Sequence, residues 1–368
     1  MTYTVLEKTN LEKGCVYNMS MNKMKAAIVG FGGMGGWHAK HLLASDVAEL
    51  AGIWDINPEK RAKASDRGIH VYESYEDLLA DKSVELVTVA TPNDVHEELV
   101  IKALDAGKNV ICEKPVTMTV ESLDRMIAAA ERNGVRFSTH QNRRWDVDYL
   151  AMKQVHDSGE IGRVINIESR VHGSRGIPGD WRQRKQYGGG MLYDWGIHLI
   201  DQMLMIFGFD QVDSVYCIAD HITNDEVDDG FRLDIYFKGG ERATIEVGTT
   251  NFISMPRFYL RADNGTALIA DWKEETQVVR WTHEAEGEVV PVQTAAGLTK
   301  TMAPRDGVTT ETYRIPCPVS DVHDYYRHFI NAIRTGCEQD VTNEHMRTDL
   351  KVILAAFKSI ETGKIVKF

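Results

Sequence analysis

The sequence predicts an α/β domain followed by an α+β domain: first a doubly wound parallel sheet, then a large, mostly antiparallel, open-faced sheet with helices on one face. Two observations predict this arrangement. Up to about Arg143, short apolar runs alternate with helical patterns, as in a parallel sheet covered by helices on both faces. Beyond that residue, segments of alternating polarity are joined by hairpin turns. We therefore expect an N-terminal extension over 1–23, a first domain over 24–144 and a second domain over 145–368.

Five buried parallel strands are expected in the first domain, at Ala26–Val29, Leu50–Trp54, Leu86–Ala90, Val110–Cys112 and Val135–Ser138. Helical patterns lie between them, at His38–Leu43, Pro58–Arg67, Tyr75–Leu79, Val95–Ala106 and Val120–Arg132. Asn57 and Thr119 are helix-start signals, and Gly107 and Gly134 stand where C-terminal caps belong.

The second domain is expected to form one sheet from six segments, at Val164–Val171, Val212–His221, Phe231–Phe237, Ala243–Gly248, Phe258–Ala262 and Ala267–Ala270. Helical patterns cover Asp148–Ser158, Asp321–Thr335 and His345–Thr362, and a polar excursion covers His283–Thr312. A sheet with one uncovered apolar face favours self-association, so we expect a homo-oligomer.

Composition narrows the class of partner. The chain has 368 residues, 43% of them hydrophobic and 26% charged, and a formal net charge of −12. This acidity argues against binding of nucleic acid or of an anionic membrane surface. The five cysteines are scattered without metal-ligand spacing, which predicts no metal site and reduced thiols in a cytoplasmic protein. The sequence contains no apolar run long enough to cross a membrane, and residues 1–24 do not resemble a signal peptide.

A glycine-rich loop directly follows the first predicted strand and consists of Gly30, Phe31, Gly32, Gly33, Met34 and Gly35. Gly30 permits a tight turn, Gly32 allows a pyrophosphate to approach the backbone, and Gly35 lets the helix close against the strand. A glycine turn that binds nothing is the alternative. The order of strand, glycine turn and helix instead favours a Rossmann dinucleotide-binding domain.

Asp55 ends the second apolar run, where a carboxylate accepts hydrogen bonds from the ribose hydroxyls of a dinucleotide. The same carboxylate repels a 2′-phosphate, so NAD is favoured over NADP. Arg61, a basic neighbour, leaves modest room for NADP.

Glu113-Lys114-Pro115 follows the fourth predicted strand of the first domain. Ligands bind outside the carboxyl ends of the strands in such sheets, so Lys114 should point into the crevice that holds the nicotinamide. There its ammonium group would donate to a substrate hydroxyl and favour the alkoxide. A solvent-exposed lysine in a loop is the alternative.

Gly188-Gly189-Gly190 precedes a helical run that carries Asp194 and His198. Residues four apart share one face of an α-helix, and histidine is the side chain best suited to move a proton near neutral pH. The alternative is a helix with a surface aspartate and a core histidine. A metal site is disfavoured because no third ligand is evident.

Four motifs together resemble the glucose-fructose oxidoreductase, inositol dehydrogenase and rhizopine catabolism (Gfo/Idh/MocA) family, over nearly all of the chain from Met24. The motifs are Gly30-x-Gly32-x-x-Gly35, Ala90-Thr91-Pro92-Asn93-x-x-His96, Glu113-Lys114-Pro115 and Gly189-Gly190-x-x-x-Asp194-x-Gly196-x-His198-x-x-Asp201.

The resemblance implies a role for each matching residue. Lys114 would contact cofactor and substrate, His198 would be the general acid/base, and Asp194 would position the substrate. Thr91, Pro92, Asn93 and His96 are expected near the cofactor's ribose and phosphates, with Glu113 near the nicotinamide ribose. Relatives of this kind are often dimers or tetramers.

Polar and aromatic side chains surround the expected crevice, among them Asn142, Arg143 and Trp181. Such a lining suits a polyhydroxylated ring, whose CH face lies on an aromatic while its hydroxyls are hydrogen-bonded. Arg143, Arg144 and Arg182 have a second interpretation, as partners of acids at a subunit contact.

The resulting hypothesis is an NAD-dependent enzyme that oxidises a secondary hydroxyl of a sugar, glycoside or polyol, including the C3 hydroxyl of a glucoside. An inositol dehydrogenase is the alternative within this class. A nicotinamide-binding sensor without turnover, and an enzyme that recycles a tightly bound cofactor between two sugars, are the other readings.

Overall fold

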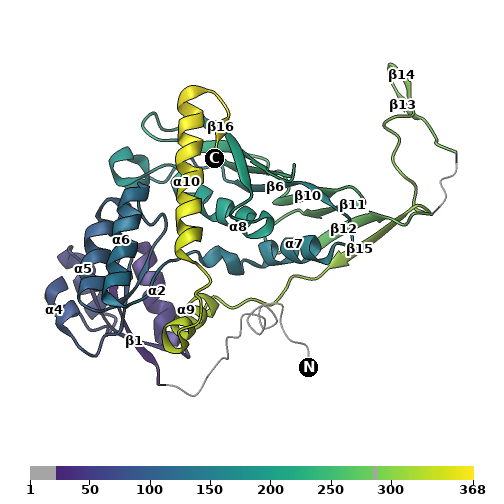
Figure 1. The fold of residues 1–368 in the computed structure, drawn as a ribbon. Helices are drawn as coiled ribbons and strands as arrows, with labels where there is room; N and C mark the ends of the chain where they lie inside the picture. The colour runs from purple at the N-terminus through teal and green to yellow at the C-terminus, as the bar shows by residue number, and fades with distance from the viewer. Residues whose placement is uncertain (1–21, 285–287) are drawn as a thin grey trace.

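The computed structural model describes residues 22–284 and 288–368, so most of the expected extension over 1–23 lies outside the described residues. Two sheets form the centres of two lobes (Figure 1). The first sheet has five parallel strands in the order β2-β1-β3-β4-β5. Their bounds are Met24–Val29 (β1), Ala48–Trp54 (β2), Leu86–Val89 (β3), Asn109–Cys112 (β4) and Phe137–Thr139 (β5).

Helices flank this parallel sheet and agree with the predicted pattern: Gly33–Ala44 (α2), Pro58–Ser65 (α3), Tyr75–Ala80 (α4), His96–Asp105 (α5) and Val120–Asn133 (α6), with a short 3₁₀ turn at Asn93–Val95 (η1). Asn57 and Thr119 cap α3 and α6 through side-chain oxygens that accept from Glu59 N and Ser122 N. Helix α2 begins ahead of the predicted His38, because the glycine loop itself forms its first turn.

The parallel strands place the predicted cofactor loop at a topological switch. Strand β1 lies between β2 and β3. From β1 the sheet therefore extends to one side through β2 and to the other side through β3, β4 and β5. The residues just beyond the carboxyl ends of the five strands are Gly30, Asp55, Ala90, Glu113 and His140. This is the edge at which ligands bind in doubly wound sheets.

The second sheet has nine strands in the order β15-β12-β11-β10-β6-β9-β8-β7-β16, and only the β6–β9 pair is parallel. The bounds are Val164–His172 (β6), Val212–Asp220 (β7), Gly230–Phe237 (β8), Arg242–Gly248 (β9), Phe258–Ala262 (β10), Gly265–Ile269 (β11), Thr276–Trp281 (β12), Thr310–Ile315 (β15) and Val366–Lys367 (β16). The predicted sheet is confirmed. Strands β12, β15 and β16 were not predicted.

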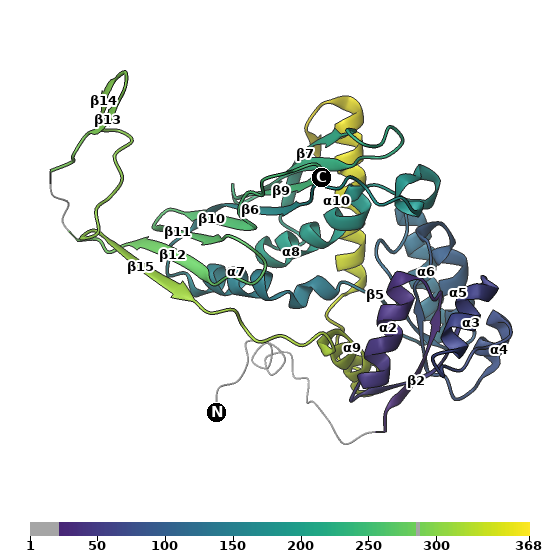
Figure 2. The same cartoon turned by 180° about the vertical axis from the view of Figure 1, so that it is seen from behind.

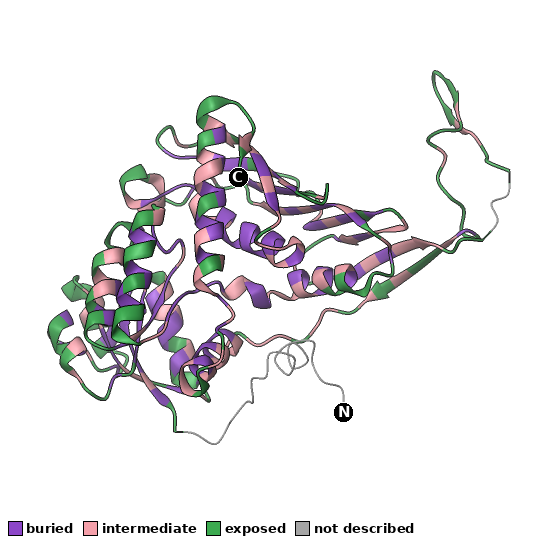
Figure 3. Ribbon diagram, in the orientation of Figure 1, coloured by how far each residue is buried: buried purple, intermediate pink, exposed green. Residues whose placement is uncertain are grey.

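Three helices cover one face of the nine-stranded sheet (Figure 2): Val147–Ser158 (α7), Ile197–Phe207 (α8) and Asn343–Thr362 (α10). In β8, Leu233 and Ile235 point toward these helices and are buried, whereas Arg232 and Asp234 alternate with them on the opposite face. The uncovered face along β8 therefore carries charged side chains, and the expectation of an apolar open face was wrong for this strand. Buried and exposed residues are distributed over both lobes (Figure 3).

The predicted excursion leaves the second sheet between β12 and β15 and carries a separate hairpin, Val292–Thr294 (β13) and Gly297–Thr299 (β14), which projects far from both lobes (Figure 1). Strand β15 begins inside the range predicted as excursion, where Thr310–Ile315 pairs with β12.

Helix α9 (Asp324–Thr335) packs against the first lobe, although it follows the second sheet in the chain. Tyr325, Tyr326 and Phe329 are part of the same buried cluster as β1 and β3. Among the described residues, no helix combines the length and apolarity that a membrane span requires.

Candidate active site

The glycine loop has the shape that a dinucleotide requires. Gly30 has a φ of +91°, and a Cβ added there would lie 2.5 Å from Ala90 O. A Cβ at Gly35 would collide with the Gly30 carbonyl, so the helix closes tightly on the strand. At Gly32 and Gly33, by contrast, an added Cβ meets none of the described atoms within 4 Å. The loop is therefore closed on its protein side and open toward the first turn of α2, where backbone N–H groups favour an anion.

Asp55 is held in place beside this loop. Its Oδ2 accepts from Phe31 N over 2.6 Å, and its Oδ1 accepts from Asn57 N over 2.8 Å. The Arg61 guanidinium donates to the Asp55 carbonyl over 2.7 Å and to the Ile56 carbonyl over 3.3 Å. Asp55 thus has a fixed carboxylate at the end of β2, and Arg61 lies within reach of the same place.

The segment after β3 carries Thr91, Pro92, Asn93 and His96, and two of these side chains fasten it to neighbouring loops. Asn93 Nδ2 donates to Gly188 O over 3.0 Å. His96 is fully buried, with Nε2 2.9 Å from Thr91 O and Nδ1 3.2 Å from Val116 O. The two side chains therefore connect the loop after β3 to the loop after β4 and to the triple glycine, which sets the position of Thr91 and Pro92.

Glu113 lies in a buried cluster with two histidines that the sequence analysis did not single out. Its Oε1 accepts from His38 Nε2 over 2.8 Å and from His140 Nδ1 over 2.9 Å, and Tyr326 Oη lies 2.8 Å from His38 Nδ1. Ligand atoms of Glu113 and the two histidines lie within 4.8 Å of one another, a spacing that could hold a metal ion. Hydrogen bonds already join all three, and we treat them as a hydrogen-bonded cluster.

The protonation states in this cluster follow from burial and mutual contact. Burial and the neighbouring His140 lower the pKa of His38 to about 4. Burial alone would raise the pKa of Glu113, but His140 and His38 hold it well below the usual value for a glutamate. Glu113 is therefore ionised, and it directly precedes Lys114 in the chain.

Lys114 bridges the two lobes. Its ammonium group donates to Asp194 Oδ1 over 2.8 Å and to Asp194 O over 2.7 Å, and the Lys114–Pro115 peptide is cis. Asp194 Oδ2 accepts from Arg182 Nε over 3.1 Å. Burial opposes ionisation of Asp194, yet Lys114 and Arg182 together lower its pKa below the usual value. The result is a half-buried carboxylate that holds two cations.

The helix that carries Asp194 begins with a wide turn. Residues Leu192–Gly196 form a π-helical turn (η5) that continues into α8. Its start is fixed by Asp228, whose Oδ2 accepts from Leu192 N over 2.7 Å, and burial raises the pKa of Asp228 to about 6. Gly190 has a φ of +101°, and an added Cβ there would collide with the Asp228 carboxylate. The triple glycine thus lets the chain pass close to Asp228, as π-turns at functional sites often require.

His198 lies one turn beyond Asp194, but the two side chains have different partners. His198 Nδ1 is 3.1 Å from Gln141 Oε1, whereas Asp194 binds Lys114 and Arg182. The hydrogen-bond partner of His198 is therefore Gln141 and not Asp194. Burial, followed by the charges of Lys114 and Arg143, lowers the pKa of His198 well below 6.5. His198 is neutral at physiological pH.

Aromatic rings and arginines line the second lobe near these groups. The Arg143 guanidinium lies 4.1 Å from the Trp195 ring centre and pairs with Asp146 at 2.9 Å. The Arg182 guanidinium lies 4.7 Å from the Trp181 ring. Asn142 begins a 3₁₀ turn, Asn142–Trp145 (η2), directly after the segment that carries Gln141. Trp181 and Arg182 lie in a short 3₁₀ turn, Trp181–Gln183 (η3). A second such turn, Lys185–Tyr187 (η4), follows it and leads to the triple glycine.

The three arginines that had a second interpretation, as subunit-contact partners, all pair with acids of their own chain. Arg143 pairs with Asp146, and Arg182 pairs with Asp180 and Asp194. Arg144 binds Asp201 through Nε to Oδ2 at 2.8 Å, and the pair is almost fully buried.

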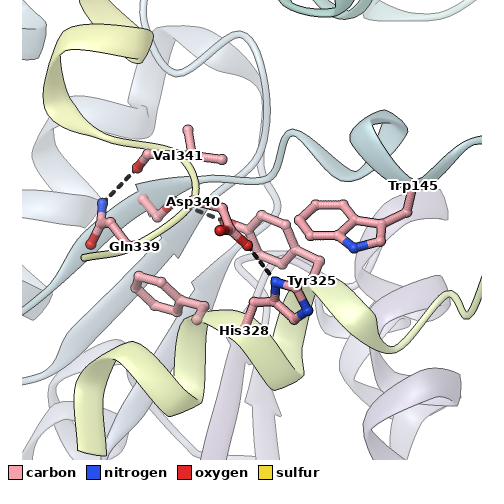
Figure 4. Close-up of a pocket in the computed structure, with 8 residues that line it drawn as sticks. Trp145, Tyr325, His328, Gln339, Asp340 and Val341 are labelled. Carbon is pink, nitrogen blue, oxygen red and sulfur yellow. Dashed lines mark hydrogen bonds and ion pairs between the residues drawn. The ribbon is translucent and has the colours of Figure 1, made fainter. Parts of the chain in front are cut away.

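A separate cavity lies beside α9 and is lined by Ser138, Trp145, Tyr325, His328, Phe329, Gln339, Asp340 and Val341 (Figure 4). Several of its polar groups are already paired: His328 contacts Asp340, and Gln339 Nε2 donates to Val341 O over 2.7 Å. It contains none of the predicted site residues, so we do not assign the substrate to it.

Two residues beside the candidate site were assigned no role from the sequence: Gln141 beside His198, and Asp349, which accepts from Gln141. Arg182, which was considered there, pairs with Asp194. The position of Gln141 just beyond the fifth parallel strand could have identified it. Asp349 lies on α10, far along the chain, and carries no local signal.

Comparison with known families agrees with this geometry. A model described as "Oxidoreductase family, NAD-binding Rossmann fold" matches residues 24–141, and a model of the GFO/IDH/MocA C-terminal domain matches residues 149–268. Fold and site define an NAD-binding oxidoreductase. The chain belongs to the Gfo/Idh/MocA family.

Individual relatives extend the comparison. The chain is 27% identical to scyllo-inositol 2-dehydrogenase (NADP(+)) IolW of Bacillus subtilis, over 94% of this chain and 96% of the relative. It is 38% identical to an uncharacterized oxidoreductase of Schizosaccharomyces pombe, but the chain spans only 52% of that relative's length. A crystal structure of an NAD-binding protein from Listeria innocua has a TM-score of 0.90 and 45% identity, and covers 95% of this chain and 100% of that one.

Proposed function

We propose that this chain is a dehydrogenase that oxidises a secondary hydroxyl of a polyhydroxylated ring with NAD as the hydride acceptor. The observation that carries the proposal is the convergence of Lys114, Asp194 and His198 at the carboxyl edge of the parallel sheet, on the side where the glycine loop is open. When bound, the nicotinamide supplies the hydride-accepting carbon, so the protein needs no nucleophile of its own.

The described residues fit such a cofactor. The open Cβ positions at Gly32 and Gly33 face the N-terminus of α2, which suits a pyrophosphate. The fixed Asp55 carboxylate suits ribose hydroxyls at the end of β2. Thr91, which Pro92 follows, lies beside Gly30 of the glycine loop, and Glu113 directly precedes Lys114 in the chain. The pyrophosphate of NAD joins two riboses, so Asp55 would bind the adenosine ribose, and Glu113 and Lys114 would lie toward the nicotinamide.

The protonation states favour proton removal by His198. A neutral imidazole accepts the proton of the substrate hydroxyl while the hydride leaves the carbon that bears this hydroxyl. Lys114 donates to the oxygen that is losing its proton and stabilises the developing negative charge. Asp194 holds Lys114 from the second lobe, with Arg182 behind it. Each of the three side chains therefore has a separate task.

The side chains near Lys114 and His198 support a substrate class. Trp195 and Trp181 offer aromatic faces, and Arg143 and Asn142 offer donors and acceptors, which together suit a ring with several hydroxyls. Relatives named for inositols include IolW and the inositol 2-dehydrogenase of Salmonella typhimurium, which is 34% identical over 49% of this chain. Cyclic polyols therefore stand beside glycosides and sugars as first candidates.

The choice of NAD rests on Asp55, whose carboxylate would repel a 2′-phosphate. The name of IolW gives NADP(+) for that relative, and Arg61 lies beside Asp55 here, so both cofactors belong in the test. We also propose a homo-oligomer formed through the uncovered sheet face. The charged residues of β8 on that face would make salt bridges between copies.

The test is nicotinamide reduction with NAD or NADP against inositols, free aldoses and glucosides, followed by the absorbance of the reduced cofactor. Reduction with one substrate group supports the proposal and identifies the class. If none reacts, the cofactor content of the purified protein is measured and a second sugar is added as acceptor. Turnover then would indicate a recycled cofactor, and continued absence of turnover would indicate a sensor and overturn the proposal.

A further inference from the structure

Gln141 links the candidate base to a buried acid on another element. The side chain is 2% exposed and follows β5 by two residues. Its Oε1 lies 3.1 Å from His198 Nδ1, and its Nε2 donates to Asp349 Oδ2 over 3.1 Å. The three residues belong to the first lobe, to α8 and to α10, so three elements meet at this amide.

We infer that Gln141 is a positioning residue that fixes the tautomer of His198, with the proton on Nδ1 and a free lone pair on Nε2. The amide oxygen accepts hydrogen bonds only, so Nδ1 must donate to it. Nε2 is then left to accept the substrate's hydroxyl proton. This inference rests on the proposed function only for that last step; the tautomer itself is a property of the protein alone.

The direction of the amide is determined by Asp349. Its Oδ2 accepts from the Gln141 amide nitrogen, which leaves the amide oxygen facing His198. Burial and the nearby charge of Asp201 raise the pKa of Asp349 well above its usual value, which favours its protonated form. A side-chain hydrogen bond to Asp201 also contributes to this raised pKa, so the proton of Asp349 is directed toward Asp201 and Oδ2 is left to accept from Gln141.

The charge of Asp201 that keeps Asp349 protonated is itself held by Arg144. Arg144 Nε donates to Asp201 Oδ2 over 2.8 Å and its second terminal nitrogen to Oδ1 over 2.5 Å. The geometry is bidentate, which holds a carboxylate in one orientation. Asp201 is the last residue of the motif that begins at Gly189. It takes no part in the proposed hydride transfer, and these contacts assign it the separate role of raising the pKa of Asp349.

The inference can be tested without substrate or cofactor. In protein labelled with ¹⁵N-histidine, two-bond correlations between ring protons and nitrogens distinguish the two neutral tautomers. The His198 signals are identified as those that vanish in His198→Asn. We expect a protonated Nδ1 and a bare Nε2. A proton on Nε2 instead would mean that the Gln141 amide is reversed, and would overturn the inference.

Variants separate positioning from simple packing. Gln141→Leu removes the acceptor and should mix the two tautomers, whereas Gln293→Leu, at an exposed position on β13, should leave the spectrum unchanged. Asp349→Asn keeps a neutral partner with an acceptor oxygen and should keep the tautomer. Asp349→Leu should not. Loss of the tautomer in Asp349→Asn as well would show that a charged Asp349 is needed, against the inference.

Turnover supplies a separate readout. In Gln141→Leu, kcat should fall up to about 100-fold, while the Kd for NAD stays close to that of the wild type. If the expected tautomer is present but no substrate reacts, the proposed function fails and the positioning of His198 stands. If turnover occurs and Gln141→Leu leaves both kcat and the tautomer unchanged, the proposed function stands and the positioning role fails.

Discussion

The Lys114 ammonium and the Asp194 carboxylate lie 2.8 Å apart although 80 positions separate them in the chain. One residue follows a strand of the parallel sheet and the other begins the helix that covers the second sheet. Each lobe therefore supplies one member of the ion pair, and neither lobe alone contains the site. Because Lys114 also donates to the Asp194 main chain, the pair fastens the loop after β4 to the π-turn that leads into α8.

Replacing Lys114 with methionine should lower kcat by about 100-fold or more, because the group that stabilises the substrate oxygen is lost. The Kd for NAD should change little, since the glycine loop and Asp55 remain. Asp194 keeps Arg182 as a partner, so the melting temperature should stay close to that of the wild type. Lys185→Met, an exposed change in the neighbouring loop, is the control. Equal kcat in Lys114→Met and wild type would remove Lys114 from catalysis.

The pH dependence of kcat/KM should reveal the lowered pKa of His198. Oxidation needs the neutral imidazole, so activity should persist as the pH falls through 6.5 and decline only below it. Arg143→Gln removes a charge that lowers this pKa, so the acidic limb should move to higher pH. Arg314→Gln, exposed on β15, should leave the limb where it is. An acidic limb at or above 6.5 in the wild type would contradict this assignment.

Two glycines of the same loop should respond differently to alanine. Gly35→Ala places a Cβ against the Gly30 carbonyl and should cost about 1–3 kcal/mol of folding stability. Gly32→Ala meets no described atom within 4 Å, so stability should be kept while NAD binding weakens. Thermal denaturation and a fluorescence titration with NAD measure the two effects. A destabilised Gly32→Ala, or full NAD affinity in it, would show that the open side of the loop is not the phosphate site.

Asp55→Asn should reduce the preference for NAD, because it removes the charge that repels a 2′-phosphate. The ratio of kcat/KM with NAD to that with NADP should fall about tenfold or more, equivalent to ~1.4 kcal/mol. Asp66→Asn, just after α3, removes an exposed acid close by and serves as the control. A ratio that both variants leave unchanged would locate the cofactor's ribose elsewhere.

The sequence could predict the elements and residues whose signals are local. Strand β1, the glycine loop and Asp55 are contiguous or nearly so, and Lys114 directly follows a strand whose carboxyl end must face the crevice. Strands β12 and β15 were missed because they lie toward one edge of the sheet and are only partly buried, which weakens their apolar alternation.

The hydrogen-bond partners within the site could not be predicted in this way. Gln141 and Asp349 are 208 positions apart, and their contact depends on how α10 packs between the lobes. The spacing of Asp194 and His198 predicted a shared helical face, but it could not predict the π-turn at Leu192–Gly196 or the different partners of the two side chains. Local periodicity carries no information about either feature.

Arg144→Met should destabilise the protein by about 3–5 kcal/mol, because it leaves Asp201 buried without its cation. The double variant Arg144→Met/Asp201→Leu removes both charges and should recover part of the loss. The control is Arg347→Met, which breaks a pair with Asp124 whose side chains are 30% and 49% exposed and should cost less than about 1 kcal/mol. Urea-unfolding midpoints compare the variants. A double variant as unstable as Arg144→Met would show that Arg144 stabilises through packing or its bond to Asp340 O, not through its charge on Asp201.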